Sequence, residues 1–449
     1  MLTLREITKA VGGIAKNISP DSEVSEFYVD SRAVKPHSVF FSLKGEKFDG
    51  ANFAEEAISQ GAEAVIVPFG AKIPATIPHI RVDDTILAMG RLAAYRVSKL
   101  KAKIIGITGS VGKTTTKELV FTLLSSRYSV FKSKKSFNNH IGLPLTILEA
   151  PPHSDFIILE YGTNHSGEIS YLTSIARPDL ALITRVGSAH IEFFGNIENI
   201  AREKTTLFRD LKYDGTAFLN AETPYFDLLN SRVPYTARRV TFGIIKGEVR
   251  PEHAKFSPLN TEFTYKGHEF IFPYPGRGML ENAIAAIAIA EYLGIPPTDM
   301  VNIIKDFKDE RMRMERIEIK GITFINDSYN SNPDSLAEVL RTFKEGGNRL
   351  IFIIGDMLEL GEYAENEHKS MGKIFVEEKH KNLITVGNLS KVISEEVKKA
   401  GIEEAYHFNS KDEAVEFLKT YIKPGDYVIL KASRALAFEE ILNKLEAIL

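Results

Sequence analysis

The sequence predicts an α/β protein of three domains, in which a central P-loop-type, mostly parallel sheet is flanked by an N-terminal α/β domain and a C-terminal Rossmann-like α/β domain. At 449 residues the chain exceeds what one hydrophobic core organises, and ordinary domain sizes give about three domains. Short apolar runs alternate with helical patterns along most of it, which favours parallel sheets covered by helices. One apolar run leads directly into a glycine-containing turn that opens a helix.

The composition is that of a globular protein, with 44% hydrophobic and 26% charged residues. A net charge of -3 gives no basic excess for nucleic acid, so we expect no nucleic-acid partner. The absence of cysteine excludes a disulfide framework and thiolate metal sites. Residues 1–20 lack the pattern of a signal peptide, and no apolar run has the length of a membrane span, so we expect a cytoplasmic protein.

The glycine-containing turn lies in the stretch IIGITGSVGKTTT at residues 104–116. Residues 103–108 predict a strand, and the segment from Lys113 predicts a helix. Glycines let several backbone N–H groups point at one anion, Lys113 supplies a positive charge, and Thr114 supplies a hydroxyl for Mg²⁺. The loop is the shorter GSVGKTT form, because Ile107 stands where the general phosphate-loop pattern has glycine.

The N-terminal domain is predicted to span residues 1–100. Residues 27–29 and 38–43 have strand patterns, and residues 52–60 have a helical pattern that Gly61 ends.

Two polar clusters follow these strands, DSR at residues 30–32 and KGEKFDG at residues 44–50. Arg32 and Lys44 could hold a phosphate-bearing ligand, with Ser31 as a hydroxyl partner. Considered alone, the clusters are more typical of surface turns, where Asp, Ser, Gly and Lys are common.

The central domain is predicted to span residues 101–310 and to follow a helix over residues 86–98. Residues 155–161, 180–184 and 217–220 predict strands of a parallel sheet. In such sheets ligands bind beyond the carboxyl ends of the strands. That rule selects the polar side chains that follow each strand.

Two such side chains are Glu160 and His190, a carboxylate and an imidazole suited to Mg²⁺ ions beside bound phosphates. Each has an ordinary alternative, since a strand-end glutamate is usually solvated and a lone histidine is usually structural. Lys204, in the helical pattern of residues 197–208, has by itself the character of a solvated surface charge.

The C-terminal domain is predicted to span residues 311–449, after helices over residues 283–293 and 299–307. It has four strand candidates, at residues 321–326, 350–354, 383–386 and 427–430. Its polar βα loops, DSYNSNP and GDMLELG, suit helix caps when considered without further context.

Several motifs together resemble the Mur ligases, ATP-dependent amide ligases that build the peptide stem of bacterial cell-wall precursors. They are GSVGKTTT, KSFNNHIGLPLT (residues 135–146), ILEYGTNHSGEI (158–169) and AHIEFFGNIENIAREKTTLF (189–208), in the order and spacing of the family. The resemblance runs from about residue 30 to the C-terminus. It departs from the family pattern at Gly278-Met279, within PGRGMLEN, where members usually have His-Asn.

The resemblance implies ATP, two Mg²⁺ ions and a carbamate on Lys204 as cofactors. Lys113 would bind the phosphates, Thr114 and Glu160 one Mg²⁺, and His190 with carbamylated Lys204 the second. The predicted catalytic residues are Lys113, Glu160, His190 and Lys204. The implied ATP-binding residues are Gly109, Ser110, Val111, Gly112, Lys113, Thr114, Thr115, Asn282, Arg313 and Asp327.

DSYNSNP, GDMLELG and NHSGEI resemble the branch of the family that joins D-alanyl-D-alanine to UDP-MurNAc-tripeptide. The implied route is an acyl phosphate, with ADP and phosphate as products, in peptidoglycan synthesis that serves cell shape and division. The implied substrate-binding residues are Ser31, Arg32, Lys44, Gly45, Asn138, Asn139, Asn330, Lys431, Ser433 and Arg434. We expect a monomer.

Three alternatives stay open at this stage. One is the tripeptide-forming Mur ligase, although its usual DNPR-type motif is absent from the sequence. Another is a ligase similar to folylpolyglutamate synthetase. The third is a non-catalytic, ATP-binding switch, for which Glu160, His190 and Lys204 would have no shared purpose.

Overall fold

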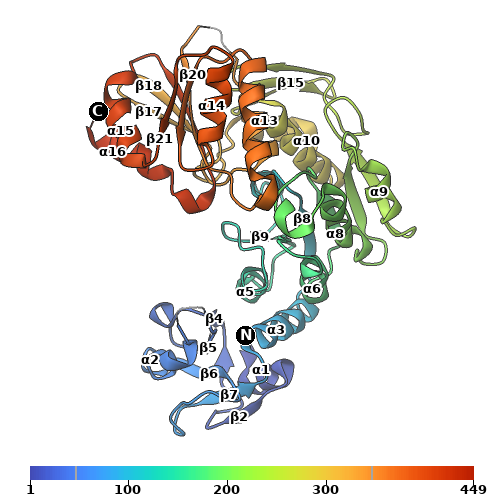
Figure 1. Ribbon diagram of the computed structural model, residues 1–449. Helices are drawn as coiled ribbons and strands as arrows, with labels where there is room; N and C mark the ends of the chain where they lie inside the picture. Colours follow the sequence, from blue (N-terminus) through green and yellow to red (C-terminus); the bar gives the residue numbers. More distant parts are fainter. Residues whose placement is uncertain (46–47, 345–346, 449) are drawn as a thin grey trace.

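The computed structural model describes residues 1–45, 48–344 and 347–448, and the chain folds into three successive parts (Figure 1). The N-terminal part comprises residues 1–99, the central part residues 103–305 and the C-terminal part residues 315–448. Residues 306–314 form the linker between the last two parts. Over the described ranges, no helix has both the length and the apolar character needed to cross a membrane.

The N-terminal part is built on a five-stranded sheet of order β2-β7-β6-β5-β4. β4 to β7 run parallel, and β2 pairs antiparallel with β7 at one edge. The strands are β2 (Ile14–Lys16), β4 (Glu26–Tyr28), β5 (Ser38–Phe41), β6 (Ala62–Pro68) and β7 (His79–Val82), beside the short pair β1 (Leu2–Thr3) and β3 (Glu23–Val24). The helices are α1 (Leu4–Val11), α2 (Ala54–Ser59) and α3 (Thr85–Lys99).

The helix predicted over residues 52–60 is two elements, a 3-10 turn (Gly50–Phe53) followed by α2. The Asp49 side chain accepts a hydrogen bond from the Ala51 N–H and so starts the turn early. The DSR cluster is also a 3-10 turn (Ser31–Ala33), capped by Asp30. The KGEKFDG cluster lies partly outside the described residues, which omit 46 and 47.

The central part is built on a six-stranded, wholly parallel sheet of order β13-β12-β11-β8-β10-β9. β8 therefore lies between β10 and β11, where the strand order reverses and ligands bind in open α/β sheets. The strands are β8 (Lys103–Thr108), β9 (Val130–Lys132), β10 (Phe156–Glu160), β11 (Leu180–Ile183), β12 (Thr216–Asn220) and β13 (Arg238–Phe242).

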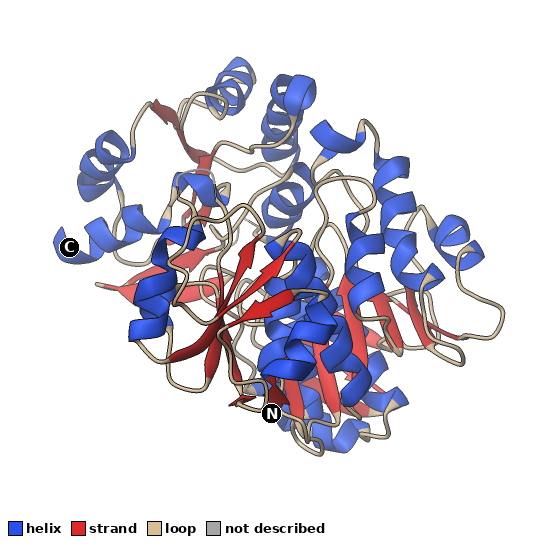
Figure 2. Ribbon diagram, turned by 90° about the horizontal axis from the view of Figure 1, so that it is seen from below, coloured by secondary structure: helices blue, strands red, loops and turns tan. Residues whose placement is uncertain are grey.

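Helices lie beside the strands of this sheet (Figure 2). They begin with α4, which starts at Lys113 directly after the phosphate loop, and α10 packs closely against α4. The helices are α4 (Lys113–Leu124), α5 (Gly142–Glu149), α6 (Glu168–Ile175), α7 (Ile191–Phe194), α8 (Ile197–Arg209), α9 (Phe226–Ser231), α10 (Arg277–Tyr292) and α11 (Pro297–Lys305).

A three-stranded antiparallel sheet, not predicted from the sequence, precedes α10. It consists of β14 (His253–Phe256), β15 (Thr261–Tyr265) and β16 (His268–Phe272). β14 is exposed along its whole length, so it lacks the alternation of buried and exposed residues that identifies a strand. β16 packs against α11 and joins this sheet to the central part.

The C-terminal part has a six-stranded sheet of order β17-β18-β22-β19-β20-β21, parallel except for β17. The strands are β17 (Glu315–Ile319), β18 (Ile322–Asn326), β19 (Leu350–Gly355), β20 (Asn382–Val386), β21 (Ala405–Phe408) and β22 (Tyr427–Lys431). The helices are α12 (Pro333–Thr342), α13 (Ala364–Glu377), α14 (Lys391–Lys399), α15 (Lys411–Tyr421) and α16 (Glu439–Ile448). The α/β class and the mostly parallel central sheet are confirmed.

Candidate active site

The phosphate loop connects β8 to α4 in a conformation that depends on glycine. Gly112 has φ +88, and a Cβ atom there would collide with the Asn282 side chain of α10. The Lys113 Nζ donates a hydrogen bond to the Gly109 carbonyl, 2.8 Å away, so the lysine folds back over the loop. Burial lowers the pKa of Lys113, Glu160 opposes that shift and Arg313 adds to it.

The end of β11 holds the loop from the other side. The Thr184 hydroxyl donates to the Val111 carbonyl at 2.6 Å, and the Ser110 hydroxyl donates to the Gly187 carbonyl at 3.0 Å. The Gly187 N–H donates back to the Ser110 hydroxyl at 2.9 Å. The loop is thus rigidly placed before any anion binds, as an electrostatic site requires.

Glu160 ends β10 beside this loop and is completely buried. Its Oε1 lies 3.4 Å from the Lys117 Nζ, and its Oε2 accepts a hydrogen bond of 3.4 Å from the Asn138 side chain. No described residue donates a hydrogen bond to Oε1. A buried carboxylate oxygen without a donor, beside a phosphate loop, is suited to a metal ion.

Lys117 is a site residue that the sequence did not indicate. Its fully buried Nζ donates to the Ser133 carbonyl at 2.8 Å and to the Lys135 carbonyl. Besides Glu160, it lies within ion-pair distance of Glu118 (3.3 Å) and Glu310 (3.6 Å). One lysine therefore connects α4 to the β9–α5 loop, to β10 and to the linker.

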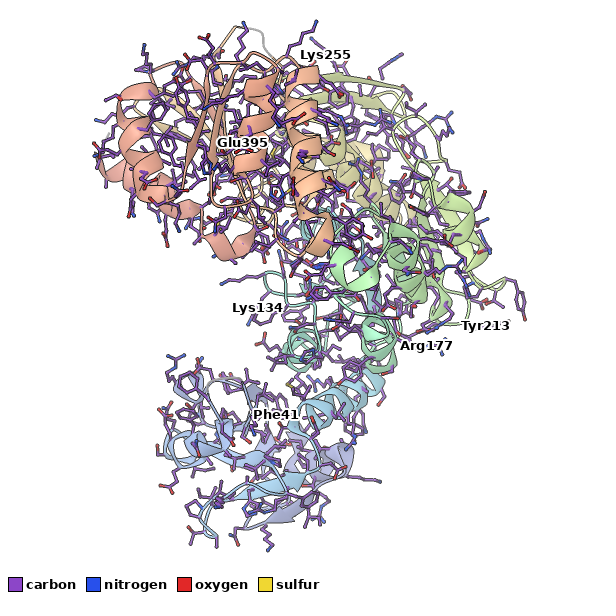
Figure 3. All side chains as sticks on the ribbon, in the orientation of Figure 1. Phe41, Lys134, Arg177, Tyr213, Lys255 and Glu395 are labelled. Carbon is purple, nitrogen blue, oxygen red and sulfur yellow. The ribbon has the colours of Figure 1, made fainter. Side chains whose placement is uncertain are left out.

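The β9–α5 loop carries Asn138 and Asn139. Asn139 accepts hydrogen bonds from the N–H groups of Ile141 and Gly142 and so organises the start of α5. In Figure 3 the Lys134 side chain of this loop projects from the side of the central sheet on which the N- and C-terminal parts lie. Lys134 and Asn139 of this loop are exposed.

His190 lies in the loop after β11, in the left-handed backbone region with φ +62. Its Nδ1 is 2.8 Å from Glu359 Oε2, which belongs to the GDMLELG loop of the C-terminal part. The contact with His190 lowers the pKa of Glu359. The Nε2 atom of His190 has no part in this contact.

Lys204 lies on α8 and is buried, with 2% of its surface exposed. Burial lowers its pKa well below the usual value, and the nearby Lys113 adds to the shift, while Glu203 opposes it. Glu203, which the sequence did not indicate, accepts the N–H groups of Gly167 and Ile169 and so holds the start of α6. A lysine predicted alone as a solvated charge is in fact buried, close enough to Lys113 for the two charges to interact.

The C-terminal part closes the site. The Arg313 Nη2 donates to the Thr114 hydroxyl at 3.0 Å, and its guanidinium lies 4.1 Å from the centre of the Tyr329 ring. The Tyr329 hydroxyl donates to Ser136 at 2.8 Å. Asp327 forms an ion pair of 2.6 Å with Lys431, which also donates to the Asn330 carbonyl.

These side chains surround a cavity of about 300 Å³ between the central and C-terminal parts. The predicted residues that line it are Ser110, Val111, Gly112, Lys113, Thr114, Thr115, Asn138, Glu160, His190, Asn282, Arg313, Asp327, Asn330 and Lys431. Asn139 lines an adjoining cavity of about 460 Å³.

Other predicted residues lie outside these cavity walls. Gly109 begins the phosphate loop without lining the cavity, and Lys204 is buried on α8 close to Lys113. The Ser433 hydroxyl accepts a hydrogen bond from the Leu358 N–H, and Arg434 forms an ion pair with Glu439 at 2.7 Å. In the N-terminal part Ser31 donates to Glu56, Arg32 pairs with Asp30 at 2.7 Å, and Lys44 and Gly45 belong to the KGEKFDG cluster.

The side chains at the phosphate loop fit Mg²⁺. Thr114 and Glu160 offer hard oxygen ligands, and Glu160 Oε1 is buried without a donor. Within the described residues no cluster of three or more His, Cys, Asp or Glu could hold a metal by itself. A Mg²⁺ ion that is shared between one carboxylate, a hydroxyl, waters and nucleotide phosphates needs no such cluster.

The fold and the site define a P-loop α/β protein. Its phosphate loop opens into a cavity that the C-terminal α/β part completes. Family comparison agrees: residues 23–96 match "Mur ligase family, catalytic domain", residues 107–290 "Mur ligase middle domain" and residues 312–434 "Mur ligase, glutamate ligase domain". The chain belongs to the Mur ligase family, as its motifs indicated.

Individual relatives cover nearly the whole chain. UDP-N-acetylmuramoyl-tripeptide–D-alanyl-D-alanine ligase of Bacillus subtilis is 35% identical over 99% of this chain and 98% of its own length. A crystal structure of MurF from Acinetobacter baumannii superimposes with TM-score 0.90 at 28% identity, covering 99% and 98% of the two chains. MurF from Thermotoga maritima in complex with ADP gives TM-score 0.83 at 28% identity, covering 95% and 97%.

Proposed function

We propose that this protein is an ATP-dependent ligase that joins D-alanyl-D-alanine to UDP-MurNAc-tripeptide and releases ADP and phosphate. The observation that carries the proposal is one cavity lined by Lys113, Thr114 and Glu160 from the central part, by Arg313 from the linker and by Asp327 from the C-terminal part. Phosphoryl transfer relies on positioning and charge neutralisation, which this arrangement supplies. The nearly full-length likeness to relatives named for this reaction supports the substrates.

The chemistry has two steps. The terminal carboxylate of the tripeptide attacks the γ-phosphorus of ATP, the bond to the bridging oxygen breaks, and ADP leaves with an acyl phosphate formed. The amine of D-alanyl-D-alanine then attacks the acyl carbon, phosphate leaves and the ammonium loses a proton. Because water would hydrolyse the acyl phosphate, a site that the C-terminal part covers favours the amine.

The chain's own residues position the reacting groups. Lys113 and the loop N–H groups hold the phosphates, with Gly109, Ser110, Val111, Gly112 and Thr115 forming the loop and its first turn. Arg313 of the linker and Asp327 of the C-terminal part bind the nucleotide, and Asn282 supports the loop at Gly112. Bound Mg²⁺ would neutralise phosphoryl charge; Thr114 and Glu160 would hold one ion, and His190 with carbamylated Lys204 a second.

The low pKa of Lys204 supports the carbamate. Carbon dioxide reacts with a neutral amine and not with an ammonium ion, and burial favours the neutral form. The product is an anion in place of a neutral amine, and a metal ion would compensate its charge at this buried position.

The substrates extend away from the phosphate loop in this proposal. Ser31, Arg32, Lys44 and Gly45 bind the uridine diphosphate end, and Asn138 and Asn139 lie along the acyl group. Asn330, Lys431, Ser433 and Arg434 surround the incoming amine. The corresponding domains are residues 1–100, 101–310 and 311–449, and we propose a cytoplasmic monomer that supplies cell-wall precursors and so serves cell shape and division.

A panel of amines tests the substrates. The protein would be incubated with ATP, Mg²⁺ and UDP-MurNAc-tripeptide plus D-alanyl-D-alanine, diaminopimelate, lysine or glutamate, and the nucleotide product weighed by mass spectrometry. We expect a product only with D-alanyl-D-alanine, heavier by the dipeptide less one water. A product with another amine, or with UDP-MurNAc-dipeptide and diaminopimelate, would assign a different ligase.

A further inference from the structure

The cavity continues past the phosphate loop on both sides of β8. On the β10 side it is lined by Glu160 and Asn138, and on the β11 side by Arg185 and the first turn of α10. The reactive γ-phosphate belongs with Glu160, because that carboxylate and Thr114 are the hard ligands of the site. The base of a bound nucleotide therefore belongs on the β11 side.

The β11 side is shaped as a slot between α10 of the central part and α12 of the C-terminal part. Pro275, Met279 and Val339 supply apolar side chains to the lining, which also includes Thr342. The helices approach closely, since a Cβ atom at Gly276 would collide with the Thr342 side chain. The apolar side chains of this lining suit the faces of a heterocycle.

One charged side chain of the slot has an unusually fixed position. Glu338 Oε1 accepts a hydrogen bond of 2.8 Å from the Gly278 N–H, and its Oε2 accepts one of 3.2 Å from Arg185 Nη1. Arg185 is held in turn by Glu281 at 2.8 Å. Burial disfavours the charge of Arg185, but Glu281 and Glu338 outweigh it and raise the pKa of the guanidinium.

Gly278 makes room for this carboxylate. A Cβ atom at residue 278 would lie 3.2 Å from Glu338 Cγ and 3.3 Å from its Cδ, so a larger side chain would displace Glu338 from the N–H group. Each carboxylate oxygen accepts more than one hydrogen bond, and here each already has one. Glu338 thus retains acceptor capacity for an N–H group of a bound base.

We propose that Glu338 selects adenine, by accepting a hydrogen bond from the exocyclic 6-amino group of the base. The inference rests on the proposed use of ATP and adds to it the residue that reads the base. Because Glu338 lies on α12, the base is read by the C-terminal part, while the phosphates are held by the central part. Discrimination between purine bases therefore requires contact between the central and C-terminal parts.

Inosine nucleotides test this directly, since they differ from adenine nucleotides by an oxygen in place of the 6-amino group. Calorimetry would compare ADP and inosine diphosphate binding to the whole protein, for the wild type and for Glu338→Ala. We expect the wild type to prefer ADP by about 10- to 100-fold, the preference that one hydrogen bond to a charged group supplies. We expect Glu338→Ala to lose most of that preference.

Two further variants keep the result interpretable. Glu338→Asp retains a charge toward Arg185 but is shorter by one methylene, and it should lose most of the preference even if the alanine variant unfolds. Arg341→Gln, on an exposed position of the same helix, should keep the wild-type preference.

An unchanged ADP preference in both folded Glu338 variants would overturn the inference. Because diphosphate binding needs no turnover, that outcome is distinct from failure of the proposed ligase activity, which would appear as no product from any substrate.

Discussion

The ammonium of Lys117 lies 3.4 Å from Glu160 Oε1, and both side chains are completely buried. A buried pair of this kind destabilises the fold strongly when one member is removed, because the remaining charge has no partner. Here the lysine also faces Glu310 of the linker. The pair therefore connects the proposed metal carboxylate to the linker between the two catalytic parts.

Replacing Lys117 by methionine should lower stability by about 3–5 kcal/mol, because Glu160 and Glu310 lose their shared cation. Denaturant unfolding measures the change. Lys369→Met is the matched control, since its partner Glu365 is exposed, and it should cost less than about 0.5 kcal/mol. Equal, small effects of the two substitutions would contradict the role assigned to the buried pair.

Lys204→Ala should abolish most ligase activity, by roughly 100-fold or more, because the carbamate would be lost as a metal ligand. Short carboxylates added to the assay should restore part of the rate. Arg202→Ala, an exposed neighbour on α8 that pairs with Glu198, serves as the control and should retain activity. Full activity of Lys204→Ala would exclude the carbamate.

The buried carboxyl group of Asp309 should make the stability of the protein depend on pH. Burial raises its pKa to about 6, although Arg313 and a hydrogen bond of 2.5 Å from Thr115 favour its charge. The folded protein therefore binds a proton more readily than the unfolded chain, and stability from this group falls as pH rises from about 4 through 6.

Asp309→Asn mimics the protonated form. Between about pH 4 and 6 its free energy of unfolding should therefore change less than that of the wild type, by up to roughly 3 kcal/mol. Unfolding midpoints measured between pH 4.5 and 7.5 provide the comparison, with the exposed Asp21→Asn as control. Parallel curves for wild type and Asp309→Asn would show that this carboxylate has an ordinary pKa.

Arg313→Ala should weaken ADP binding by about 10-fold, because the side chain bonds Thr114 and stacks on Tyr329 at the cavity. Calorimetric titration with ADP gives the affinity. Arg311→Ala removes an arginine two residues away whose side chain is 86% exposed, and should leave the affinity within about 2-fold. Similar losses in both variants would point to a general charge effect instead.

The sequence predicted the parts of the site that local signals encode. β8, the phosphate loop and α4 are consecutive in the chain, and β10 and β11 were each predicted within two residues of their observed ends. The position of Glu160 at a strand end followed from the rule for parallel sheets. The role proposed for Lys204 came only from the resemblance to the family.

The remaining residues could not be found locally, since their significance depends on contacts distant in sequence. Lys117 has the appearance of an ordinary helix lysine until Glu160 and Glu310 are brought to it. Glu338 has the same ordinary appearance on α12 until Gly278 and Arg185 meet its carboxylate. The short strand β9 and the exposed β14 were missed because neither has enough residues or alternation to indicate a strand.

The most direct test of the central claim is phosphate release from ATP, measured with UDP-MurNAc-tripeptide in the presence and absence of D-alanyl-D-alanine. We expect release that requires both substrates and matches, mole for mole, the formation of the longer peptide. Release that is slow and indifferent to both would contradict it, and would favour a nucleotide-binding switch over a ligase.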